Sequence, residues 1–126
     1  MFAETSRFMN SSIFDLTGKV ALVTGGAGHL GSAFSEALAS QGAKVVIASR
    51  DLEKCRKFAA KLGPQHEALA LDLDDDKAVR SLIDGIVARH GALDVLVNNG
   101  YNGPSPKLDE ATAEDFDKTF HRGLTS

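Results

Sequence analysis

The chain has 126 residues, 14 basic and 17 acidic side chains that give a net charge of −3, and 43% apolar residues. This length and apolar content fit one small folded domain and argue against a disordered tail. The mild acidity argues against a protein that coats nucleic acid. The single cysteine, Cys55, excludes an intrachain disulfide and a cysteine-rich metal site, so we expect a reducing, cytoplasmic location.

The sequence offers neither a membrane segment nor a set of metal ligands. The longest stretch without Asp, Glu, Lys or Arg covers residues 20–35, and it is too short and too rich in glycine to cross a bilayer. Residues 1–12 lack the apolar core of a signal peptide, so we expect a flexible extension before a domain over residues 13–126. The histidines have no ligand spacing, so no metal is expected.

The first half of the chain alternates between strand and helix patterns. Residues 19–24 form an apolar run that ends in glycines, which predicts a buried strand. A helix follows over residues 29–41, with an apolar face made of Leu30, Ala33, Phe34, Ala37 and Leu38. The β-branched run 45–48 predicts a second strand, and residues 51–62 predict a second helix that ends before a Gly-Pro pair.

The second half continues the same alternation. Residues 66–72 predict a weaker strand, and residues 75–90 predict the clearest helix, with one apolar stripe and a glycine just after it. Residues 93–97 predict a fourth strand, residues 100–106 a loop, and a capping-box pattern at Thr112 the start of a last helix. This alternation predicts an α/β fold with a doubly wound parallel sheet.

A glycine-rich segment lies between the first strand and the first helix. Gly26, Gly28 and Gly31 satisfy the GxGxxG spacing in the place where a dinucleotide site needs it. The glycines permit a tight turn and a close approach of the backbone to a pyrophosphate, and the helix start offers free N–H groups. The alternative is an ordinary glycine-rich turn.

The end of the second strand predicts which nucleotide binds. An NAD site usually has an acid there for the ribose 2′-OH, whereas this chain has Ser49 and Arg50. The guanidinium of Arg50 can pair with a 2′-phosphate, which favours NADP. Two alternatives remain: Asp51 binds the ribose of NAD, or Arg50 is a solvated charge and Asp51 caps the next helix.

Four segments together resemble the classical short-chain dehydrogenase/reductase family. Residues 14–25 resemble its usual entry into the first strand and the start of its TGxxxGxG signature, residues 72–73 resemble its strand-three end, and residues 97–100 resemble its NNAG motif. The likeness covers the chain from Phe14 onward. It implies a Rossmann-like doubly wound parallel sheet that is truncated, with strand order 3-2-1-4, and the N-terminal, cofactor-binding half of the family's domain.

The resemblance also implies a set of cofactor-binding residues. In that family Asp72 and Leu73 would hold the adenine ring, and Asn98 would brace the central strands. The alternatives are that Asp72 is a strand-end acid that faces water and that residues 98–100 form an ordinary turn. The cofactor is expected to be NADP, with NAD as the alternative, and the expected cofactor-binding residues are Gly25, Ala27, Gly28, His29, Leu30, Gly31, Arg50, Asp72, Leu73, Asn98 and Gly100.

Three departures from the family pattern bear on the site. His29 stands where the signature has its middle glycine, so its imidazole either crowds the pyrophosphate, bonds a phosphate, or only starts the helix. The NNAG motif lacks one residue after Asn99. The catalytic Asn of the family would fall near Gly123, and glycine has no amide to hold a water.

The family's catalytic side chains are not found in this sequence. Its chemistry uses a Ser, a Tyr whose pKa is lowered by a cation, and a Lys four residues after that Tyr. The single tyrosine is Tyr101, and residue 105 is serine. We therefore expect no catalytic residues in this chain, which has about half of the family's usual length. The fourth strand would then form an open edge of the sheet. Because the chain reaches the beginning of the family's dimer-forming helix, we also expect a homo-oligomer through the C-terminal helix.

Three hypotheses follow from these patterns. The first is an NADP-dependent oxidoreductase that transfers hydride between the nicotinamide and an alcohol or carbonyl substrate, present as its cofactor-binding half, with a small-molecule substrate only in a full-length form. The residues before the glycine loop resemble the branch that acts on sugar acids and polyols. The second is a non-catalytic NADP(H)-binding module, or an inactive truncated remnant. The third, a methyltransferase, would need an acid at the end of the second strand.

Overall fold

The computed structural model describes residues 13–101, 106–107 and 109–121. The predicted extension over residues 1–12 and the position of Gly123 lie outside these ranges. The described elements, in chain order, are β1 (Val20–Thr24), α2 (His29–Ser40), β2 (Lys44–Ser49), α3 (Leu52–Leu62), β3 (Glu67–Ala70), α4 (Asp76–His90), β4 (Val95–Val97) and α5 (Ala113–Phe120). None of the helices in the described ranges combines the length and the apolar content that a bilayer crossing needs.

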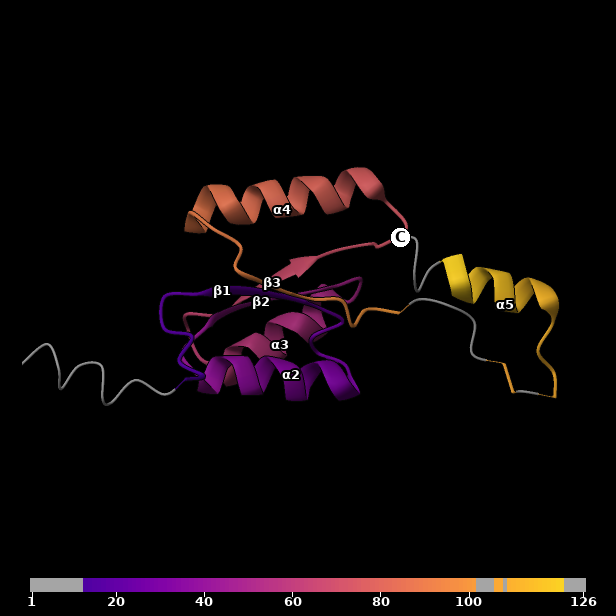
Figure 1. The fold of residues 1–126 in the computed structure, drawn as a ribbon, viewed down its shortest axis with the longest axis horizontal. Helices are drawn as coiled ribbons and strands as arrows, with labels where there is room; N and C mark the ends of the chain where they lie inside the picture. Colours follow the sequence, from indigo (N-terminus) through magenta and orange to yellow (C-terminus); the bar gives the residue numbers. More distant parts are fainter. Residues whose placement is uncertain (1–12, 102–105, 108, 122–126) are drawn as a thin grey trace, which may run out of the picture.

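The four strands form one parallel sheet. Their order is β3-β2-β1-β4, and every neighbouring pair runs parallel, with Leu22 opposite both Val46 and Leu96. Helices α2 and α3 lie on one side of the sheet and α4 lies on the other, as Figure 1 shows. The predicted doubly wound α/β fold and its strand order are therefore confirmed.

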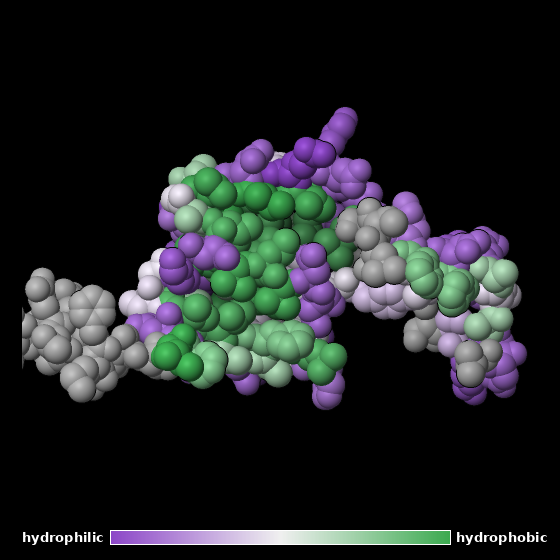
Figure 2. Space-filling model, viewed as in Figure 1, coloured by the Kyte–Doolittle hydropathy of each residue, from purple (hydrophilic) through white to green (hydrophobic). Residues whose placement is uncertain are grey.

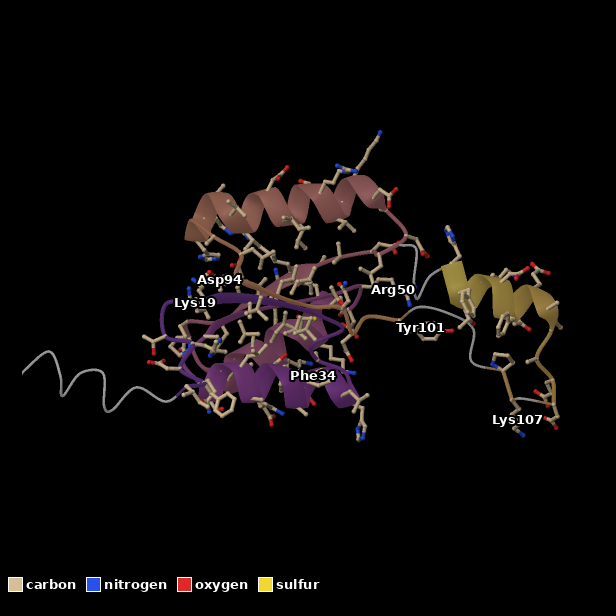
Figure 3. All side chains as sticks on the ribbon, in the orientation of Figure 1. Lys19, Phe34, Arg50, Asp94, Tyr101 and Lys107 are labelled. Atoms are coloured by element: carbon tan, nitrogen blue, oxygen red, sulfur yellow. The ribbon has the colours of Figure 1, made fainter. Side chains whose placement is uncertain are left out.

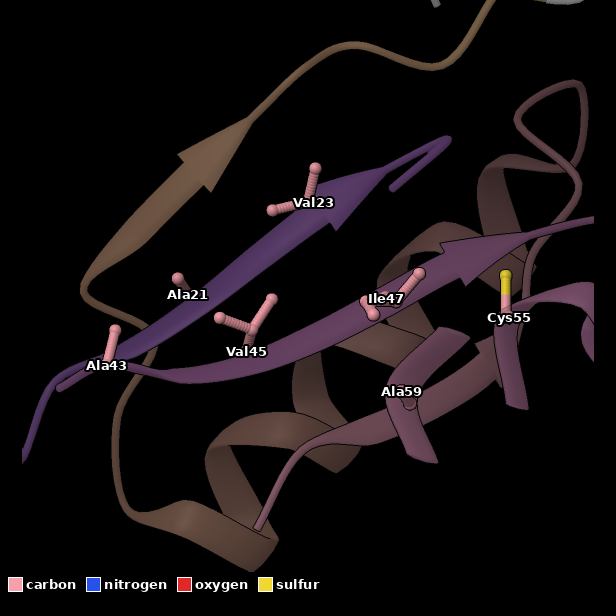
Figure 4. Close-up of a cluster of buried hydrophobic side chains, with 7 residues drawn as sticks. All are labelled: Ala21, Val23, Ala43, Val45, Ile47, Cys55 and Ala59. Atoms are coloured by element: carbon pink, nitrogen blue, oxygen red, sulfur yellow. The ribbon is translucent and has the colours of Figure 1, made fainter. Parts of the chain in front are cut away.

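The core consists of two clusters, one on each side of the sheet. Because side chains alternate along a strand, β1 and β2 contribute to both clusters and are buried almost throughout. The cluster on the side of α2 and α3 is drawn in Figure 4 and contains Ala21, Val23, Ala43, Val45, Ile47, Cys55 and Ala59. The cluster on the side of α4 contains Val20, Leu22, Val46, Ala48, Leu71 and Ile86.

The two outer strands are shorter than the sequence pattern predicts. The carboxylate of Asp94 accepts a hydrogen bond from the N–H of Val20 at 2.8 Å, so this side chain takes a place where a strand would offer a carbonyl. The regular part of β4 consequently begins at Val95 rather than at residue 93. At the other edge, β3 ends at Ala70, and Asp72 then begins a turn in which its carbonyl accepts the N–H of Asp75.

Helix α2 buries a different face from the one that its apolar pattern predicts. Its buried residues are Gly31 and Ser35, whereas Leu30 is 64% exposed and Phe34 is 44% exposed. The helix meets the glycine loop through its smallest side chains because a Cβ on Gly31 would lie only 2.1 Å from the carbonyl oxygen of Gly25. Leu30 and Phe34 therefore face away from the core, whereas Leu38 packs against the cluster on the side of α2 and α3. Figure 2 shows apolar side chains gathered on the viewed face between α4 and α2.

Candidate cofactor-binding site

The loop between β1 and α2 is a tight turn that glycine makes possible. Gly25 has a positive φ of 63°, a conformation that favours glycine. Its N–H donates to the carbonyl of Ala48 at 2.7 Å, and its own carbonyl accepts the N–H of Gly28 at 2.9 Å. These bonds fix the loop at the carboxyl ends of β1 and β2, which is where open α/β sheets bind their ligands.

Two other glycines of the loop are required by close packing. A Cβ on Gly26 would lie 3.0 Å from the carbonyl oxygen of Val23 and from the hydroxyl of Ser35, which donates a hydrogen bond to the Gly26 carbonyl. A Cβ on Gly31 would collide with the backbone of Gly25 and with the amide of Asn99. The predicted glycine spacing therefore has a steric basis in this fold.

The start of α2 is open, unlike the start of the other described helices. Gly28 is its N-cap, no side chain bonds its first N–H groups, and its first turn contains no acid. In contrast, Asp51 caps α3, Asp75 caps α4, and a capping box of Thr112 and Asp115 caps α5. Free amides and the positive end of the helix dipole make the start of α2 suited to an anionic group.

The segment after β4 closes the glycine loop from the other side. The hydroxyl of Thr24 accepts the N–H groups of Asn99 at 3.0 Å and of Gly100 at 2.8 Å. The side-chain amide of Asn99 donates to the carbonyls of Thr24 at 3.1 Å and of Gly25 at 3.2 Å. Residues 99–100 are thus tied to the end of β1 rather than forming an isolated turn.

The bracing role predicted for Asn98 belongs instead to Asn99. Asn98 directly continues β4 and is exposed. Because side chains alternate along extended backbone, Asn99 points to the same side as Val97, which packs with the cluster beneath the glycine loop. The prediction placed the brace one residue too early.

A cavity of about 280 Å³ lies beside this loop. Half of its lining was predicted from the sequence, namely Gly25, Ala27, Gly28, Arg50, Leu73 and Gly100. The rest of the lining is Ala48, Ser49, Asp51, Lys54, Leu71 and Tyr101. Several of these follow the carboxyl ends of β2 and β3, so the rule that ligands bind at strand ends could have found them.

Five of the predicted cofactor-binding residues do not line this cavity. His29 and Leu30 begin α2 with exposed side chains, and Gly31 is buried against Gly25. Asp72 is exposed, and its carboxylate accepts the N–H of Asp74 at 3.1 Å, as in the alternative of a strand-end acid that faces water. The fifth is Asn98.

The charged residues of the cavity lining lie between the end of β2 and the first turn of α3. Arg50 follows β2 directly, and Lys54 lies in the first turn of α3. The carboxylate of Asp51 accepts the N–H of Lys54 at 3.0 Å, so the alternative in which Asp51 caps this helix is confirmed for that residue. This end of the cavity therefore carries two cations and one acid that is already bonded to the backbone.

Tyr101 also lines the cavity. Figure 3 shows Arg50 and Tyr101 at the same end of the sheet. The hydroxyl of Tyr101 lies 3.0 Å from the hydroxyl of Thr119 in α5, so a cavity residue is linked to the last described helix.

Comparison with known proteins places the chain in a family. Residues 19–126 match the short chain dehydrogenase family. The chain is 40% identical over 105 residues to a sorbitol dehydrogenase of Cereibacter sphaeroides, which covers 83% of this chain and 41% of that protein. It is 34% identical over 109 residues to a galactitol 2-dehydrogenase of Agrobacterium fabrum, which covers 86% of this chain and 43% of that protein. The likeness to polyol dehydrogenases is therefore confirmed.

Solved structures give the same result. The Pseudomonas aeruginosa RhlG/NADP active-site complex matches with a TM-score of 0.77 and 31% identity, over 89% of this chain and 44% of that one. A 3-ketoacyl-(acyl-carrier-protein) reductase from Brucella melitensis, complexed with NADH, matches with a TM-score of 0.75 and 32% identity, over 86% and 45%. The chain spans less than half the length of these relatives. Its glycine loop, parallel sheet and sequence make it a member of the short chain dehydrogenase family.

Proposed function

We propose that this chain is the cofactor-binding half of an NADP-dependent short chain oxidoreductase. The observation that carries the proposal is the open start of α2 beside a cavity that the glycine loop helps to line. The pyrophosphate of the dinucleotide would bind to the free N–H groups there, because they are the donors that no side chain satisfies. The solved relatives in complex with NADP and with NADH support this assignment.

The residues around the cavity fit a dinucleotide. A Cβ on Gly28 would stand 3.1 Å from the Gly25 carbonyl oxygen, so the tight turn of the loop favours glycine at this cavity-lining position. Leu71 and Leu73 offer an apolar wall for the adenine ring, and the backbone of Gly100 lines the cavity from the side of β4. When bound, the nicotinamide supplies hydride transfer to or from an alcohol or carbonyl carbon.

The substrate belongs to the proposal for the whole protein. The relatives named sorbitol and galactitol dehydrogenase favour a polyol or the matching ketose. In the present sequence Tyr101 is the only tyrosine and residue 105 is serine, so the Tyr and Lys that such chemistry uses are expected outside these 126 residues. The role of this half is then to hold and orient the cofactor.

Arg50 is the residue proposed to select NADP. It stands directly after β2, it lines the cavity, and its planar guanidinium can bond two oxygens of a 2′-phosphate. The alternative in which Asp51 binds the ribose of NAD is weaker, because one oxygen of its carboxylate already caps α3.

The test is the substitution Arg50→Ala. We expect it to weaken NADPH binding by about 1.5 kcal/mol, roughly tenfold in Kd, while NADH binding stays within about twofold. Arg56→Ala is the matched control, because Arg56 is exposed on α3 and does not line the cavity. Isothermal titration with each nucleotide measures both effects. If the substitution weakens the binding of both nucleotides equally, or of neither, the proposal that Arg50 selects NADP is contradicted.

A second candidate is a module that binds NADP(H) without catalysis. The observation that favours it is the absence of a lysine four residues after the only tyrosine in this sequence. The two candidates differ in turnover, which can be followed by the absorbance of NADPH with sorbitol or galactitol. Binding without turnover by the longest natural form of the protein supports the module, and turnover by that form supports the oxidoreductase.

A further inference from the structure

We propose that Lys54 is a second phosphate-binding residue, which acts with Arg50 on the 2′-phosphate of NADP. This inference rests on the proposed function, and it assigns a cation that the sequence patterns did not single out. It concerns how strongly the site separates NADP from NAD.

The positions of the two cations bring them to the same end of the cavity. Arg50 is the first residue after β2, and Lys54 is in the first turn of α3, so only Arg50 and Asp51 lie between the two structural elements. Both side chains line the cavity together with Ser49. The hydrogen bond from the N–H of Lys54 to Asp51 fixes the backbone from which the lysine side chain extends.

The charges of this region are unbalanced. Within the described ranges, neither Arg50 nor Lys54 forms an ion pair, whereas Lys57, one turn further along α3, pairs with Glu53 at 3.8 Å. Among the described residues that line the cavity, Asp51 is the single acid, so two cations without an ion pair in this part of the chain lie near one carboxylate that is bonded to the helix start.

This arrangement suits a dianion better than a neutral hydroxyl. A phosphate monoester carries about 1.5 to 2 negative charges near neutral pH, so one guanidinium leaves it only partly neutralised. An ammonium group on a flexible stem can approach the oxygens that a planar guanidinium does not reach. The ribose 2′-OH of NAD has no such charge, and Lys54 would then contribute little to its binding.

The experiment compares three variants of the whole chain. Lys54→Gln removes the charge, Lys54→Arg keeps it, and Lys57→Gln removes a charge from the same helix outside the cavity. The Kd values for NADPH and NADH are measured by the fluorescence of the reduced nicotinamide. For Lys54→Gln we expect the Kd of NADPH to rise about fivefold, as for a partly exposed ion pair, with NADH within about twofold.

The other variants and the salt dependence complete the test. Lys54→Arg and Lys57→Gln are expected to keep the wild-type preference for NADPH. Higher salt should reduce the difference between wild type and Lys54→Gln, because the contact is electrostatic and near the surface. If Lys54 has only a structural role, Lys54→Gln would instead weaken the binding of both NADPH and NADH, and the size of this loss would not depend on salt.

Two results would overturn the inference. One is an unchanged Kd for NADPH in Lys54→Gln, and the other is an equal loss for NADPH and NADH. If either occurs while Arg50→Ala still loses NADPH selectively, the proposed function stands without Lys54. A wild-type chain that binds neither nucleotide overturns both proposals.

Discussion

His66 is a histidine that the fold holds in its neutral form. Its Nδ1 atom accepts the N–H of Val45 at 3.1 Å, and its Nε2 atom is buried without a partner in the described part of the chain. Burial is the main cause that lowers the pKa of His66 below its usual 6.5, and the positive charge of Lys44 lowers it further. Protonation would also remove the acceptor that Val45 uses at the start of β2.

This arrangement predicts a loss of stability in mild acid. The unfolded chain binds a proton on His66 near pH 6.5, whereas the folded chain binds it only at a lower pH. The stabilisation is therefore complete above about pH 6.5 and is lost as the pH falls from 6.5 through the folded pKa. Urea unfolding at pH 7.5 and 5.5 measures this difference in the free energy of unfolding.

The control for this prediction is a residue that cannot titrate. His66→Gln can keep an acceptor for Val45 but carries no proton in this range. We expect a smaller fall in the free energy of unfolding between the two pH values for this variant than for wild type. Equal falls would show that other groups cause the acid sensitivity.

The structure places His29 at the start of α2 and outside the cavity lining. The sequence left open whether its imidazole crowds the pyrophosphate, bonds a phosphate or starts a helix. In the structure it is the first residue of α2, it is exposed, and the cavity lining does not include it. These observations favour a residue that starts the helix.

At the scale of elements, α2 and α4 both contain a glycine, but they use it differently. Gly31 lies where α2 meets the glycine loop, with a virtual Cβ 2.1 Å from a backbone carbonyl that cannot easily move. Gly85 lies within α4, and a Cβ there would approach only the flexible end of Arg89 at 3.0 Å. One glycine is thus required by packing and the other is tolerated.

We expect alanine to have opposite effects at these two positions. Gly31→Ala should destabilise the chain by about 2 kcal/mol and weaken NADPH binding, because the loop must shift to accept the Cβ. Gly85→Ala should stabilise it by up to about 1 kcal/mol through better helix propensity. Thermal unfolding of both variants checks this pair. A neutral Gly31→Ala would show that the loop adapts and that its glycine is dispensable.

The sequence predicts the order and kind of the elements well because each has a strong local signal. Periodic apolar residues, capping side chains and glycines mark each described helix and strand, although β3 and β4 are shorter than the pattern predicts. The buried face of α2 could not be predicted from periodicity, since the contact of Gly31 with Gly25, not the apolar stripe, decides it. In the site, Asn99 was missed because its role depends on the end of β1, a distant segment that it meets only in the folded sheet.

At the scale of the whole molecule, one edge of the sheet carries exposed apolar side chains. β4 is one of the two edge strands, and its central residue Leu96 is 49% exposed. Phe34 of α2 and Val87 of α4 are 44% and 41% exposed, on the two sides of the sheet. Exposed strand edges beside apolar side chains favour pairing with another polypeptide.

We therefore expect the 126-residue chain to self-associate at micromolar concentrations, and Leu96→Lys to reduce this association. A lysine on an edge strand opposes strand pairing by its charge and its hydration. Light scattering after size-exclusion chromatography measures the mean mass, and circular dichroism checks folding. Ile13→Lys is the control, because Ile13 is 92% exposed and precedes β1. A monomeric wild-type chain would contradict the prediction.

The amide that holds the carbonyls of Thr24 and Gly25 belongs to a residue 75 and 74 positions later. During synthesis, the glycine segment therefore leaves the ribosome well before the group that fixes its shape. A nucleotide that recognises the finished loop binds only chains in which the fourth strand has already docked. By mass action, such a ligand would draw newly made chains toward the complete sheet and away from partly assembled forms.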